Sequence, residues 1–147
     1  MSRKFSLILL LLFVGFSNSL SQTYNLKIEI ENIKKDGIIY MAVYNNSEDF
    51  NYINNGENKK KDRWVFNLIE DISVNGFNKD IILEKGVYAI SLFVDTNGNK
   101  KLDTNFVGIP NEQYGFSNNA MGLLGKPSFK NASFKLTQES KIKIILK

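Results

Sequence analysis

The stretch Tyr24-Asn-Leu-Lys-Ile-Glu-Ile-Glu31 decides the fold class, because apolar and polar residues alternate along all of it. A period of two is typical of a β-strand with one buried face and one face in water. The turn signal Lys35-Asp-Gly37 follows, and the apolar run 38–44 predicts a second strand. We expect these two strands to pair as an antiparallel hairpin.

The rest of the chain continues in short strand patterns separated by turn residues. We expect strands at 64–67, 72–74, 77–83, 87–94, 132–136 and 142–146, the last two forming a final pair joined at 138–140. The polar, asparagine-rich segment 45–62 predicts a long loop with one helical turn near 47–50. Lysines alternate with apolar residues along 142–146, which is typical of an outer strand. The whole pattern predicts an all-β sandwich of immunoglobulin or transthyretin-like type.

The N-terminus predicts export. Met1-Ser-Arg-Lys4 is basic, 12 mostly apolar residues follow at 5–16, and small polar residues occupy 17–21. This is the pattern of a secretory signal peptide cut before Gln22, since a membrane span needs about 20 apolar residues. We therefore expect a signal peptide at 1–21, a single β-sandwich domain at 22–147, a periplasmic or extracellular location, and no membrane span after cleavage.

The composition excludes several kinds of chemistry. The chain has no cysteine and no histidine, so it cannot form a disulfide, a zinc cluster, a thiol nucleophile or a Ser-His-Asp relay. Loss of Arg3 and Lys4 with the signal peptide leaves 17 basic residues against 15 acidic ones. Such a small excess gives no indication of a nucleic-acid partner.

The segment 95–131 shows neither strand nor helix periodicity, and a loop of this length in a small domain usually serves a function. It contains Phe106, Tyr114, Phe116 and Phe129, so we expect an ordered loop that caps one end of the sandwich. Those aromatic side chains can face inward as the core of the cap, or outward as a binding surface.

The cap loop opens with Asp95-Thr-Asn-Gly-Asn-Lys-Lys-Leu-Asp103, which suggests a calcium site. Oxygen-bearing side chains stand at relative positions one, three, five and nine, and a main-chain carbonyl would serve at position seven; these residues are Asp95, Asn97, Asn99, Asp103 and Lys101. Lys100 replaces the usual glycine at position six and Phe106 the usual acid at position twelve, so we expect a weak structural site with a Kd on the order of 0.1–1 mM. A turn closed without metal around Asn97-Gly98 is the alternative.

The runs 95–110, 112–119 and 125–129, together with Gly86-Val-Tyr-Ala-Ile90, resemble a bacterial exported family catalogued as domain of unknown function 2141. The resemblance extends over nearly the whole chain after the signal peptide. The family pattern usually has glycine at the position of Lys100. The resemblance implies no activity, because the family has none that is established.

Two functions remain open at this stage. Tyr114, Asn118 and Asn119 combine a flat apolar ring with amide groups, which suits a sugar ring or a peptide chain. They predict a non-enzymatic module that binds an envelope glycan or protein. The alternative is a small carboxylate-dependent hydrolase in which Asp103 and Glu112 cleave a glycosidic bond, provided that they lie roughly 5–10 Å apart.

Overall fold

The computed structural model describes residues 21–52, 63–123 and 125–147. The expected signal peptide therefore lies, apart from Ser21, outside the described residues, as does the 53–62 part of the expected loop. Within the described ranges, no helix is both long and apolar enough to cross a membrane.

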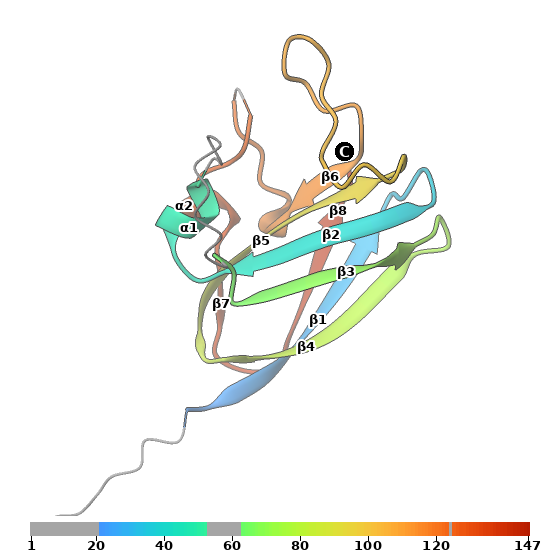
Figure 1. The fold of residues 1–147 in the computed structure, drawn as a ribbon. Helices are drawn as coiled ribbons and strands as arrows, with labels where there is room; N and C mark the ends of the chain where they lie inside the picture. The colour runs from blue at the N-terminus through green and yellow to red at the C-terminus, as the bar shows by residue number, and fades with distance from the viewer. Residues whose placement is uncertain (1–20, 53–62, 124) are drawn as a thin grey trace, which may run out of the picture.

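Two sheets stack face to face, which confirms the all-β sandwich (Figure 1). One sheet has the strand order β4-β1-β8, and the other has the order β3-β2-β5-β6, with β7 also paired to β5. The strands are β1 (Thr23–Glu31), β2 (Gly37–Tyr44), β3 (Phe66–Ile72), β4 (Phe77–Glu84), β5 (Gly86–Asp95), β6 (Tyr114–Phe116), β7 (Phe134–Leu136) and β8 (Ser140–Ile145). The helical pieces are α1 (Ser47–Asn51), the 3₁₀ turn η1 (Ser117–Asn119) and α2 (Phe129–Ala132).

The hairpin expected from β1 and β2 is wrong. β1 pairs with β4 and, in parallel, with β8, whereas β2 pairs with β3 and β5 in the other sheet. The five residues between β1 and β2 carry the chain from one layer to the other. Asn32 makes the corner at a φ of 61°, and its side-chain amide donates to the carbonyl oxygen of Leu146 at 2.7 Å.

Two further pairing expectations need correction. β7 and β8 do not form a final pair, because β7 joins β5 while β8 lies beside β1 as an outer strand. The separate strands expected at 64–67 and 72–74 are one strand, β3. Leu68 and Ile72 of β3 are buried, whereas Ile69 and Asp71 between them are exposed, so the alternation continues through the polar centre.

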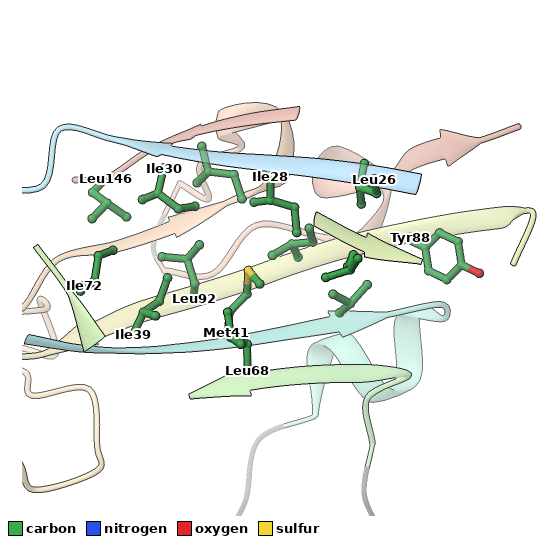
Figure 2. Close-up of a cluster of buried hydrophobic side chains, with 14 of the residues drawn as sticks. Leu26, Ile28, Ile30, Ile39, Met41, Leu68, Ile72, Tyr88, Leu92 and Leu146 are labelled. Atoms are coloured by element: carbon green, nitrogen blue, oxygen red, sulfur yellow. The ribbon is translucent and has the colours of Figure 1, made fainter. Parts of the chain in front are cut away.

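The main core fills the space between the two sheets. Figure 2 shows Leu26, Ile28 and Ile30 of β1 pointing toward the side chains that β2 and β5 contribute from the opposite layer. The three β1 side chains are at most 2% exposed, as expected for a strand that buries every second residue.

A second, smaller cluster lies on the outer face of the five-stranded sheet. Phe50 of α1 is fully buried there with Ala89 and Ala132. The helices α1 and α2 lie side by side over one end of this face (Figure 1). They leave the remainder of the outer face for the candidate site.

Ser117 closes a gap beside β5. That strand pairs with β7 through residues 86–88 and with β6 through residues 91–93, so the two residues between these ladders, 89 and 90, pair with neither strand on this side. The N–H of Ile90 donates to Ser117 Oγ at 2.8 Å, and the Ser117 hydroxyl donates to the carbonyl oxygen of Ala132 at 2.6 Å. The segment 95–131, expected to show neither strand nor helix, contains β6, η1 and most of α2.

Candidate functional site

Asp95 ends β5 and holds the loop that follows. The residue is only 1% exposed, and its carboxylate accepts main-chain N–H bonds from Asn97 at 3.2 Å, Gly98 at 2.7 Å and Lys100 at 2.7 Å. Burial by itself would raise the pKa of Asp95, but these N–H donors outweigh burial and hold the pKa below its usual value. The loop is therefore wound around an ionised carboxylate.

The structure brings Asn97, Asn99 and Asp103 together in the same loop. Both side-chain amides donate to the Asp103 carboxylate, Asn97 at 2.6 Å and Asn99 at 2.8 Å, while their oxygens accept the N–H groups of Asn99 and Lys101. Lys100 adopts a φ of 65°, the left-handed conformation that favours glycine. In the part of the chain that the structure describes, no group of three or more His, Cys, Asp or Glu residues is placed to hold a metal.

Calcium binding by the 95–103 loop stays a prediction. With the expected Kd, a tenfold excess of calcium adds about 1.4 kcal/mol to the free energy of unfolding. For a domain of this size, that raises Tm by roughly 4–8 °C. Thermal melting in 10 mM calcium and in chelator measures the shift, and Asp103→Asn should remove it. Equal midpoints in the two buffers would contradict the prediction.

Glu112 joins the two ends of this loop. It is 8% exposed, and its Oε1 accepts both the N–H of Thr96 at 2.8 Å and the Thr96 hydroxyl at 3.1 Å. Its Oε2 accepts the N–H of Asp103 at 3.1 Å. Both carboxylates of the alternative, hydrolytic hypothesis, Asp103 and Glu112, are thus hydrogen-bonded within the loop.

A row of large apolar side chains crosses the outer face of the five-stranded sheet. The strand register places Ile69 beside Tyr40, Tyr40 beside Phe93, and Phe93 beside Tyr114. The rings of Tyr40 and Phe93 stack with their centroids 5.0 Å apart and their planes 7° apart. In β6, Gly115 turns inward against β8, where a Cβ would lie 2.7 Å from Ile144 Cγ2.

Small side chains leave a hollow on the outer face of the sheet beside this row. Ala42 and Ser91 are paired at the centre of the next row, and Asn67 and Phe116 stand at its two ends. Two segments rise beside the hollow, the loop between β5 and β6 and the segment after η1 (Figure 1). Together they form an open groove of about 890 Å³, which is large for a small-molecule site.

The lining of this groove is mainly apolar and aromatic. It consists of Tyr40, Met41, Ala42, Tyr44, Trp64, Asn67, Leu68, Ile69, Ser91, Leu92, Phe93, Leu102, Val107, Gly108, Ile109, Pro110, Tyr114, Phe116, Met121, Gly122, Leu123, Gly125 and Lys126. Val107 and Ile109 are each 60% exposed and Leu123 is 98% exposed. So much apolar surface gathered around one hollow is typical of an interaction site.

Lys126 stands where the groove meets the helices. Its Nζ lies 4.0 Å from the centroid of the Phe50 ring and 5.4 Å from that of Tyr44, and it donates to the Phe50 carbonyl oxygen. Burial lowers the pKa of Lys126 to about 8. Among the described residues, no carboxylate forms an ion pair with it.

Residues 28–144 match the family described as "Uncharacterized protein conserved in bacteria (DUF2141)". The chain belongs to this family. The match confirms the resemblance seen in the sequence, and it spans the 95–103 loop and all the residues that line the groove. No curated protein and no solved structure matches the chain.

In this DUF2141 chain, the three residues expected to bind a ligand lie in different places. Tyr114 is half-buried and lines the groove. Asn118 donates to the carbonyl oxygen of Ser133 at 2.7 Å, and the side-chain oxygen of Asn119 accepts the N–H of Ile145 at 2.8 Å. Both amides therefore hold neighbouring main chain and are absent from the groove lining.

Sequence reasoning missed most of the DUF2141 groove, including Tyr40, Phe93 and Lys126. A signal was present, because the strand runs 38–44 and 87–94 are apolar on both faces, although a sandwich strand needs only one apolar face. The Asp103 and Glu112 pair, by contrast, does not line this groove.

Proposed function

We propose that this protein is an exported, non-enzymatic binding module, and that its groove holds a ligand with a long apolar portion such as a lipid acyl chain. The observation that carries the proposal is the lining of the groove, in which stacked aromatic rings and aliphatic loop residues surround a hollow floored by Ala42 and Ser91. Each CH₂ group that such a chain buries contributes about 0.8 kcal/mol. Export rests on the basic and apolar pattern of residues 1–21.

An acyl chain suits the groove better than a glycan or a protein segment does. Sugar hydroxyls and peptide groups need hydrogen-bond partners when they leave water. Apart from the tyrosine hydroxyls, the Trp64 indole N–H and Lys126, the polar side chains among the described lining residues are those of Asn67 and Ser91. The amides of Asn118 and Asn119, which would suit a glycan, are already bonded to main chain.

Binding of the neutral apolar fluorophore N-phenyl-1-naphthylamine tests the proposal. We expect a Kd of roughly 1–100 µM, the range open to an apolar molecule of this size. Ser91→Phe should weaken binding more than tenfold, because the new ring fills the hollow beside Phe93 without entering the core. Fluorescence titration measures both affinities.

Asn78→Phe is the matched control, since Asn78 is an exposed residue of β4 in the other sheet. It adds the same ring outside the groove and should leave the fluorophore affinity unchanged. A wild-type protein that does not bind the fluorophore, or one in which Ser91→Phe and Asn78→Phe bind equally well, would contradict the proposed function.

A further inference from the structure

We infer that the ligand is a free fatty acid, and that the ammonium of Lys126 binds its carboxylate while the acyl chain lies in the groove. This inference rests on the proposed function and adds the chemistry of the ligand head group. Its basis is charge complementarity, because the described lining is largely apolar and contains one cation, Lys126, at the end where the helices begin.

Among the described residues that line the groove, Lys126 is the one charged residue, so no described carboxylate of the lining competes for this cation. An apolar ligand without a charged head would leave Lys126 unpaired beneath it, and an unpaired charge removed from water is costly. A ligand with one negative charge completes the site.

The surroundings of Lys126 prepare it for an anion. The ammonium has three N–H donors, of which the Phe50 carbonyl takes one. The Phe50 and Tyr44 rings partly bury the ammonium, although the residue as a whole is exposed at the mouth of the groove. The same burial lowers its pKa to about 8, so the ammonium form still predominates at neutral pH. A carboxylate would restore the stability of the charged form through a charge-assisted hydrogen bond, which is stronger than one between neutral groups.

The geometry leaves room for the chain. From Tyr44, beside Lys126, to Tyr40 the outer face of β2 runs about 13 Å, at roughly 3.3 Å per residue. Ala42 lies midway, and the walls at Ile109 and Leu102 continue the apolar surface. A phosphate head group would be bound better by several donors or by the fork of an arginine, and no arginine is among the described residues that line the groove.

Competition between two ligands of equal chain length tests the inference. Dodecanoate or dodecanol is titrated against N-phenyl-1-naphthylamine bound to the wild-type chain, Lys126→Met, Lys126→Arg and Lys130→Met. The displacement of the fluorophore gives the affinity of each ligand for each variant. In Lys126→Met we expect the dodecanoate affinity to fall about 10- to 100-fold, the contribution of a hydrogen bond to a charged group. The dodecanol and fluorophore affinities should not fall, because methionine keeps the apolar stem and removes the charge that a neutral ligand would leave unpaired.

The two remaining variants separate charge from fold. Lys126→Arg keeps the cation and should retain the preference for dodecanoate. Lys130→Met removes an exposed lysine of α2 outside the lining and should have no effect. If wild type binds the fluorophore but Lys126→Met weakens both ligands equally or neither, the fatty-acid inference is overturned while the proposed function stands. If wild type does not bind the fluorophore at all, both fail.

Discussion

Phe50→Ala is expected to lower the free energy of unfolding by about 3–5 kcal/mol, the usual cost of deleting a buried aromatic ring. Phe50 is fully buried and is the centre of the smaller cluster. The rings of Tyr44, Phe116 and Phe129 meet it edge-on, with centroids 5.5, 6.3 and 5.8 Å away. A domain of this kind has a total free energy of unfolding of about 5–15 kcal/mol, so this one ring contributes a large share of it.

Urea unfolding monitored by circular dichroism measures the loss, and Phe106→Ala is the matched control. It deletes the same side chain at a position that is 99% exposed, so its effect should stay within about 0.5 kcal/mol. Phe50→Ala should also weaken dodecanoate binding, because it deletes the ring that contacts the Lys126 ammonium. Equal unfolding midpoints for the two variants would mean that Phe50 does not anchor α1.

The strands were predictable from the sequence, but most of their partners were not. The alternation along residues 24–31 predicts that every second side chain is buried, which is a local property of one strand. It does not report which neighbour supplies the hydrogen bonds. Thus β1 and β2 were found, yet they belong to different layers, because the short connection after Glu31 carries the chain from one sheet to the other.

The candidate site divides in the same way. Asp95, Asn97, Asn99 and Asp103 lie within nine residues of sequence, so their spacing was enough to predict that they share one loop. The groove depends instead on strand register, which brings together side chains from four strands. Ile69 and Tyr114 are far apart in the sequence. They belong to the same row of side chains only because β2 and β5 lie between their strands and set the register.

Ser117→Ala is expected to lower the free energy of unfolding by about 2–4 kcal/mol, although it removes a single oxygen atom. Ser117 is fully buried, and its hydroxyl accepts the N–H of Ile90 and donates to the carbonyl of Ala132. Alanine would leave both main-chain groups without partners in a place closed to water. An unsatisfied buried group of this kind costs about 1–3 kcal/mol.

Hydrogen exchange distinguishes this account from a general loss of packing. In Ser117→Ala the Ile90 amide should exchange much faster than the neighbouring amides of β5, since it loses its partner while theirs remain. Ser133→Ala is the control, because the Ser133 hydroxyl donates to Lys130 at an exposed position and its loss should cost less than about 1 kcal/mol. Unchanged protection at Ile90 would show that another acceptor replaces Ser117. In that case the junction of β5 with β6 and β7, from which Tyr114 and Phe116 reach the groove, would not depend on this hydroxyl.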